Sequence, residues 1–183
     1  MADEFQNTSS PLRVSLFDDI VVDGIGLAFE RQAHSEGFKF VAGLDEVGRG
    51  CLAGPVVAAA CILDISKPLP IGIDDSKKLT ATKRERITLE IKDVAVAYAI
   101  GEASAAEIDE INILEATKLA MLRAIEQLSP AADYLLIDAL SLKRPRLPQK
   151  AIIKGDTISA SIAAASIIAK TYRDDLMTRH HET

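Results

Sequence analysis

Four carboxylates stand at the ends of apolar runs in this sequence. They are Asp45 and Glu46, which follow the run from residue 40, Asp138 after residues 134–137, and Asp156 after the run from residue 149. An ionised carboxylate in a buried strand is destabilised by several kcal/mol unless a cation or hydrogen bonds compensate. Hard oxygen ligands favour Mg²⁺ or Mn²⁺ over zinc. We therefore expect two such ions, roughly 3.5–4 Å apart, in the arrangement used for in-line phosphoryl transfer.

Each of these acids also has a structural interpretation. Asp156 precedes a predicted helix and could serve only as its N-cap, and Asp138 could end a strand and bond a turn. Asp45 and Glu46 are neighbours, and neighbouring strand residues point to opposite faces of a sheet. These two carboxylates can share a site only if the strand ends or kinks there, which the following Val47 and Gly48 would permit.

The turn Gly48-Arg49-Gly50 directly follows the first pair of acids and Val47. Its glycines let backbone amides approach a ligand closely, and the guanidinium of Arg49 supplies a fixed positive fork. Acids, accessible amides and a cation at one point indicate a metal together with a polar, phosphorylated ligand.

Two basic runs flank these acids and could bind phosphates or simply form solvated faces. The first contains Lys77, Lys78, Lys83, Arg84 and Arg86, and the second contains Lys143, Arg144, Arg146, Lys150 and Lys154. Of these we expect Lys77 and Lys78 to hold phosphates without reading base sequence. The net charge of −6 argues against general nucleic-acid binding, and an aromatic content of 4% without Trp disfavours a base-stacking platform.

The elements that must position these residues alternate between strand and helix patterns. Strands are predicted over 39–47, 55–63, 94–104, 133–140 and 149–156, with the first two antiparallel. Helices are predicted after Thr80, over 105–128 and over 157–182. Residues 14–38 combine a short apolar segment with a helical pattern and suggest a peripheral arm or helix whose Phe17, Ile20 and Val21 dock on the domain. We therefore divide the 183 residues into an arm over 1–37 and one catalytic α/β domain over 38–183.

The composition indicates a cytoplasmic protein with no membrane partner. No apolar run reaches the length of a membrane span, and the acidic N-terminus is unlike a signal peptide. Cys51 and Cys61 are interpreted as small buried hydrophobic residues in a reducing compartment. We expect a monomer.

Five segments of the chain together resemble bacterial ribonuclease HII. They are AGLDEVGRG…LAGPVVAAA, DDSKKL, INILEAT…AM, LLIDAL and KGDTISASIAAASIIAKTYRD, and they occur in the order of that family. The Gly-Arg-Gly turn separates the chain from the sister family, ribonuclease HIII. The resemblance implies an RNase H-like fold, in which a mixed central sheet is flanked by helices.

The resemblance also implies an activity and a role for each motif. The family cleaves the RNA strand of RNA/DNA hybrids, and cleaves 5′ of single ribonucleotides in duplex DNA, leaving 3′-hydroxyl and 5′-phosphate ends. By matching position, Asp45, Glu46 and Asp138 would be metal ligands and Asp156 the fourth acid. The turn over 48–50 would sense the 2′-hydroxyl and the adjoining phosphate. Such an enzyme would serve ribonucleotide removal and RNA primer degradation.

The chain departs from the family pattern at two places. Cys51 stands where the family usually has Pro, and the chain stops at Thr183, where members continue into a helical segment carrying a stacking Tyr. The resemblance therefore implies a C-terminally truncated member with weak activity and blunted preference for RNA–DNA junctions. Two rivals are a non-catalytic hybrid-binding module and a different metal-dependent phosphotransferase on a related fold. Retention of all four acids favours an enzyme.

Overall fold

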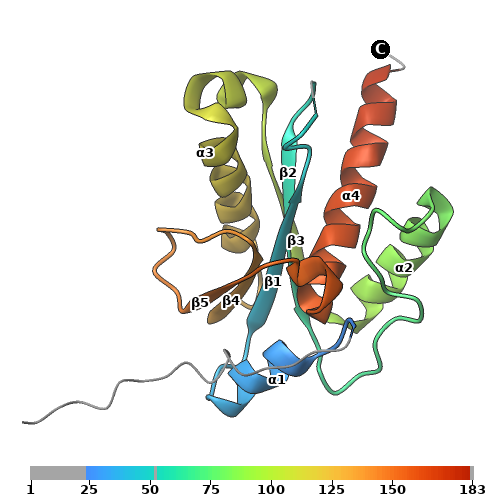
Figure 1. Ribbon diagram of the computed structural model, residues 1–183, viewed down its shortest axis with the longest axis vertical. Coiled ribbons are helices and arrows are strands. Elements are labelled where there is room, and N and C mark those ends of the chain that lie inside the picture. The colour runs from blue at the N-terminus through green and yellow to red at the C-terminus, as the bar shows by residue number, and fades with distance from the viewer. Residues whose placement is uncertain (1–23, 52, 182–183) are drawn as a thin grey trace, which may run out of the picture.

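The computed structural model describes residues 24–51 and 53–181, and within them five strands form one mixed sheet. The strands are β1 (Val41–Val47), β2 (Val56–Leu63), β3 (Ala95–Ala103), β4 (Tyr134–Asp138) and β5 (Gln149–Ile152), in the spatial order β3-β2-β1-β4-β5 (Figure 1). β1 pairs with β2 antiparallel and with β4 parallel. The expected mixed sheet and the antiparallel first pair are confirmed. Phe17, Ile20 and Val21 lie outside the described residues.

Helices cover both faces of the sheet. They are α1 (Ala28–Ser35), α2 (Ala81–Val94), α3 (Ala105–Glu126) and α4 (Ala160–His181). α3 covers one face, while α4 and α2 lie over the other (Figure 1). Every residue of β2 is buried, because its side chains alternate between the two resulting cores. None of the helices among the described residues is long and apolar enough to cross a membrane.

β1 and α4 approach each other unusually closely at Gly43. A Cβ atom built on Gly43 would lie 2.1 Å from the carbonyl carbon of Ser161, so no other residue fits this position without movement. The facing part of α4 is correspondingly small, since Ala160, Ala163, Ala164 and Ala165 are fully buried. The close approach brings the first half of α4 directly onto the strand that carries Asp45.

α3 meets the other face in the same way, at Gly101, whose Cβ would lie 2.1 Å from the carbonyl oxygen of Ala120. The prediction of one continuous helix over 105–128 is wrong in detail. Asn112 has a φ of 69°, and its side chain accepts hydrogen bonds from the amides of Leu114 and Glu115 at 3.0 and 3.2 Å. Asn112 therefore caps the second part of the helix, and its own local hydrogen bonds outweigh the apolar periodicity.

Glu30 of α1 is a buried carboxylate that fastens this helix to the start of α4. It is 1% exposed, and its Oε1 atom accepts hydrogen bonds from Ser159 Oγ, Ser161 N and Ser161 Oγ at 2.6–2.9 Å. A carboxylate at the first turn of a helix is favoured by the helix dipole. The predicted domain boundary at residue 38 remains a prediction.

We predict that Gly43→Ala destabilises the fold by about 1–3 kcal/mol, the range for overpacking a well-packed core. The added methyl group would meet the Ser161 backbone, which cannot yield as a flexible side chain can. Urea denaturation followed by circular dichroism measures the change. Gly26→Ala is the control, because its Cβ would meet nothing within 4 Å in the part of the chain that the structure describes. Equal stability of the two variants would contradict the close packing of β1 on α4.

Candidate functional site

Three of the predicted acids come from neighbouring parallel strands. Asp45 and Glu46 lie near the C-terminal end of β1, and Asp138 is the last residue of β4. Because these two strands run in the same direction, their carboxyl ends meet at one edge of the sheet. The acids also interact electrostatically, because the negative charge of Asp138 adds to burial, the main cause, in raising the pKa of both Asp45 and Glu46.

The fourth acid reaches the site differently from the prediction. The fifth strand ends at Ile152, and Asp156 lies beyond it in a short 3₁₀ turn, Gly155–Thr157. The expected strand over 149–156 is therefore too long, because Lys154 takes a left-handed conformation with a φ of 56° and turns the chain. The turn is held by the Gly155 amide, which donates to Asp138 Oδ1 at 2.7 Å, and Asp156 in turn raises the pKa of Asp138.

Asp45 and Glu46 lie within β1, which runs on to Val47, and their side chains have different partners. Asp45 is 5% exposed and hydrogen-bonds Ser166 of α4. Glu46 instead accepts a hydrogen bond from Arg49 Nη1 at 3.4 Å. The two carboxylates diverge as neighbouring strand residues do. The two carboxylates still interact directly, since burial and then the charge of Glu46 raise the pKa of Asp45, and Asp138 interacts electrostatically with both.

Burial controls the protonation of these acids. Burial raises the pKa of Asp45 to about 8 and also raises the pKa values of Glu46 and Asp138. For Glu46 the cation of Arg49 opposes the rise, and for Asp138 the hydrogen bond from Gly155 does so. Ionising such a group in place requires positive charge nearby.

The donor set fits a divalent cation. Glu46 Oε2 is buried and has no hydrogen-bond partner within the described part of the chain. An unsatisfied buried carboxylate oxygen costs free energy unless a ligand completes it. Within residues 24–51 and 53–181, no three Asp, Glu, His or Cys side chains are already arranged as the ligands of a metal ion. The oxygen donors are spread over β1, β4 and the 3₁₀ turn, and a cation would draw on all three.

The two lysines singled out by sequence lie in different environments. Lys77 Nζ is 3.3 Å from Asp156 Oδ2, so the structure brings Lys77 to the acids. Lys78 pairs with Asp74 at 3.4 Å, and both of these side chains are largely exposed. The loop that carries the lysines is tied to α4, because the Ser76 hydroxyl lies 2.9 Å from that of Ser166.

The turn over 48–51 closes with a hydrogen bond from the Cys51 amide to the Gly48 carbonyl at 3.1 Å. The backbone amides of Arg49 and Gly50 donate to no atom within the described residues, and both residues are exposed. Gly48 has a φ of 99°, and a Cβ on it would lie 2.5 Å from Arg173 Nε. Cys51 is exposed, so its interpretation as a buried residue is wrong, whereas Cys61 is buried.

Sequence reasoning missed two residues of α4 that hold the site together. Ser166 contacts both Asp45 and Ser76, and the buried Arg173 donates to the carbonyls of Pro55 and Ala53 at 3.1 and 3.0 Å. Both are polar side chains within a helix face that packs on the sheet, seven residues apart. A spacing of seven residues is about two helical turns, so the two side chains lie on the same face of α4. Polar residues at this spacing in an otherwise apolar helix were the pattern that could have identified them.

Comparison with known proteins gives consistent matches. Residues 42–183 match the family model of ribonuclease HII. The chain is 58% identical over 148 residues to ribonuclease HII of Desulfitobacterium hafniense, covering 81% of this chain and 56% of that relative's length. Ribonuclease H2 from Pyrococcus horikoshii OT3 superimposes with a TM-score of 0.67 and 28% identity, covering 79% of this chain and 77% of that one. Bst-RNase HIII in complex with Mn²⁺ superimposes with a TM-score of 0.62 and 25% identity, covering 80% and 56%.

We predict that the metal-free protein loses stability as the pH rises. The folded-state pKa of Asp45, about 8, lies above the ordinary 3.8, so its contribution to stability is fully present below pH 3.8 and is lost progressively as the pH rises from there to about 8. Asp45→Asn keeps an acceptor for the Glu46 amide and cannot ionise. At pH 8 it should be more stable than the unmodified chain by on the order of 1–3 kcal/mol, and this difference should shrink toward pH 4.

Urea denaturation in EDTA at a series of pH values measures this difference. Asp64→Asn is the control, because hydrogen bonds from Ser66 lower the pKa of the exposed Asp64. The contribution of Asp64 is lost only as the pH falls, so its replacement should leave the slope between pH 5 and 8 unchanged. A gap between Asp45→Asn and the unmodified chain that is independent of pH would contradict the buried-carboxylate description.

Proposed function

Because the chain belongs to the ribonuclease HII family, we propose that it is an endonuclease that hydrolyses the RNA strand of RNA/DNA hybrids. We include cleavage 5′ of a single ribonucleotide in duplex DNA, leaving 3′-hydroxyl and 5′-phosphate ends. The observation that carries the proposal is the meeting of Asp45, Glu46 and Asp138 at one sheet edge, with Glu46 Oε2 buried and unsatisfied. Ribonucleotide removal and RNA primer degradation in the cytoplasm are the corresponding roles.

The acids would hold the divalent cations of this reaction, Mg²⁺ or Mn²⁺. Asp45, Glu46 and Asp138 are the proposed ligands, with Asp156 as the fourth acid, and the RNase HIII relative was solved with Mn²⁺. When bound, such ions lower the pKa of water and stabilise the leaving oxygen. Ser166 orients Asp45, and the Gly155 amide orients Asp138 by its 2.7 Å hydrogen bond. Lys77 balances Asp156 at 3.3 Å.

Substrate selection would rest on the turn over 48–51. The amides of Arg49 and Gly50, which have no acceptor within the described part of the chain, would donate to the 2′-hydroxyl, the group that distinguishes RNA from DNA. Gly48 belongs to the same recognition turn, and its positive φ lets the turn pack under Arg173. Lys77 and Lys78 would contact neighbouring phosphates, which position a duplex without reading its sequence.

We predict that Asp138→Asn abolishes cleavage while the fold survives. The asparagine keeps an acceptor for the Gly155 amide but loses the ligand charge, so the rate should fall by about 100-fold or more. The assay is cleavage of an RNA/DNA hybrid, and of duplex DNA with one ribonucleotide, in saturating Mg²⁺ or Mn²⁺. Asp109→Asn, an exposed change on α3, is the control and should be fully active. Near-normal turnover by Asp138→Asn would exclude Asp138 as a ligand.

We predict that Gly50→Ala impairs cleavage far more than folding. A Cβ on Gly50 meets nothing within 4 Å among residues 24–51 and 53–181, so we expect an approaching substrate to be what clashes with it. Turnover on the single-ribonucleotide duplex should fall about tenfold or more, a loss of about 1.4 kcal/mol in transition-state binding.

The matched variant is Gly48→Ala. Here the added Cβ would lie 2.7 Å from the Pro55 carbonyl oxygen, so the free energy of unfolding should fall as well. Denaturation curves and cleavage rates measured side by side separate the two effects. Full activity of Gly50→Ala, or cutting of an all-DNA duplex by the unmodified chain, would defeat the assignment of this turn.

A further inference from the structure

The two basic runs of the chain differ in how their charges are used. In the first run four cations pair with acids of the protein itself, namely Lys77 with Asp156, Lys78 with Asp74, Arg84 with Asp174 and Arg86 with Glu90. Their charge is largely neutralised within the molecule. The run over 77–86 therefore presents less free positive charge than its sequence suggests.

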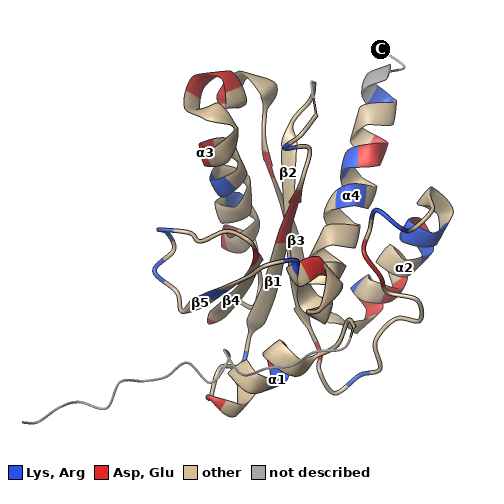
Figure 2. Ribbon diagram, in the orientation of Figure 1, with Lys and Arg blue, Asp and Glu red and all other residues tan. Residues whose placement is uncertain are grey.

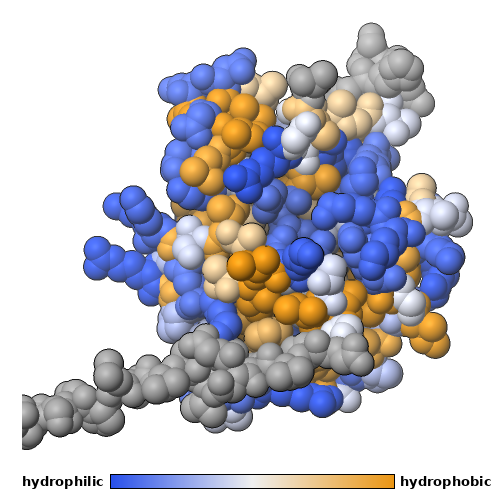
Figure 3. All heavy atoms as spheres, viewed as in Figure 1, coloured by the Kyte–Doolittle hydropathy of each residue, from blue (hydrophilic) through white to orange (hydrophobic). Residues whose placement is uncertain are grey.

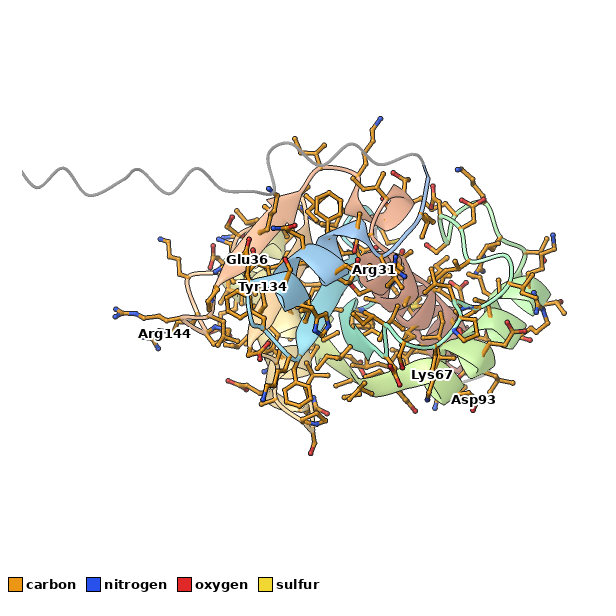
Figure 4. All side chains as sticks on the ribbon, turned by 90° about the horizontal axis from the view of Figure 1, so that it is seen from below. Arg31, Glu36, Lys67, Asp93, Tyr134 and Arg144 are labelled. Atoms are coloured by element: carbon orange, nitrogen blue, oxygen red, sulfur yellow. The ribbon has the colours of Figure 1, made fainter. Side chains whose placement is uncertain are left out.

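The second run is not neutralised in this way. Residues 139–155 contain five Lys or Arg and no Asp or Glu, in a chain of net charge −6. Lys143, Arg144, Arg146 and Lys154 are exposed, and within the described residues their side chains form no ion pair or hydrogen bond. The ribbon of the loop between β4 and β5 stands out from the sheet and carries blue segments in Figure 2, and hydrophilic atoms project from the same side in Figure 3. Arg144 points outward at the edge of the molecule in Figure 4.

This loop is anchored at its base. The amide side chain of Gln149 bonds both backbone groups of Leu142, accepting from its N–H at 2.8 Å and donating to its carbonyl at 2.7 Å. Leu142 is itself buried, at 5% exposure, in the core beneath α3. The cations therefore extend from an ordered base, which reduces the entropy lost when they bind a partner.

The loop also begins and ends at the candidate site. It leaves the sheet at Asp138, and the segment returns through Lys154 to Asp156. The Gly155 amide donates a hydrogen bond to Asp138 Oδ1 at 2.7 Å, so the two ends of the segment lie together. If the scissile phosphate of a nucleic acid lies at the acids, the rest of the nucleic acid must extend away from the site along this edge of the sheet. Cations without acids or aromatic rings recognise phosphates rather than bases.

We propose that Lys143, Arg144, Arg146 and Lys154 form a contact surface for the phosphate backbone of the duplex, outside the reacting position. The inference rests on the proposed function for the identity of its ligand. The surface holds the duplex by charge alone, so it serves all-DNA and hybrid duplexes equally. It adds affinity without contributing to the choice between ribose and deoxyribose, which belongs to the turn over 48–51.

The test is fluorescence anisotropy of short labelled duplexes, one all-DNA and one RNA/DNA hybrid, titrated in EDTA between about 50 and 200 mM salt. The double variant R144S/R146S should bind both duplexes about tenfold more weakly at the lower salt concentration. Its plot of log affinity against log salt should be shallower by about 1–2. With metal restored, KM for the hybrid should rise while kcat stays constant, as expected for loss of uniform binding.

The matched control is R31S/K39S, which removes the same charge from two exposed cations that are also unpaired within the described residues. Arg31 belongs to α1 and lies away from the loop that carries Arg144 (Figure 4). Its duplex affinity should change by no more than about twofold, because distant charges are screened.

The outcomes separate this surface from the reaction. If R144S/R146S and R31S/K39S have the same duplex affinity and the same salt slope, the proposed contact surface is wrong, whereas the proposed nuclease activity is unaffected. If R144S/R146S alone loses duplex affinity but the unmodified chain cleaves no hybrid, the proposed nuclease activity is wrong and the proposed contact surface stands. Failure of the unmodified chain to bind either duplex would overturn both.

Discussion

The structure depends on keeping one carboxylate, that of Asp45, in a region with almost no water. The absence of a side chain at Gly43 lets α4 press against β1, and the small residues of α4 then cover the strand two positions before the acid. Burial raises the pKa of Asp45 to about 8. The hydroxyl of Ser166 and the amide of Glu46 only partly offset that burial. A metal ion bound at this edge of the sheet, as proposed above, would supply the positive charge that is still missing.

A single helix, α4, organises the elements around this carboxylate. Its first turn bonds the buried Glu30, its middle holds Asp45 and the loop of Ser76 through Ser166, and its second half secures the turn after β1 through Arg173. These contacts all belong to one helix, so the proposed metal ligands and the turn over 48–51 are positioned by the same rigid element. The basic loop after β4 is independent of α4 and is fixed by Gln149 instead.

The sequence predicted the elements that depend on local pattern. The positions of β1, β2 and β4 follow from their apolar runs, and the cap at Thr80 and the acids at the ends of β1 and β4 follow from side-chain type and spacing. What escaped prediction depends on contacts between distant residues or on local backbone geometry. Asp156 arrives on a 3₁₀ turn because of one left-handed residue, and Asn112 divides a helix that has unbroken periodicity. The partners of Ser166 and Arg173 are 90 and 118 residues away, beyond the reach of any pattern.

The anchoring of the recognition turn by Arg173 imposes an order on biosynthesis. The carbonyls of Ala53 and Pro55 are made early, but the side chain that secures them is 120 and 118 residues downstream. While the chain emerges from a ribosome, β1 to β5 can pair before α4 exists, since the sheet needs none of its backbone groups. In a nascent chain that lacks α4, the carbonyls of Ala53 and Pro55 have no hydrogen bonds from Arg173. The turn after β1 is therefore secured last, when α4 docks on the sheet, and the sugar selectivity proposed for this turn would be acquired only at that step.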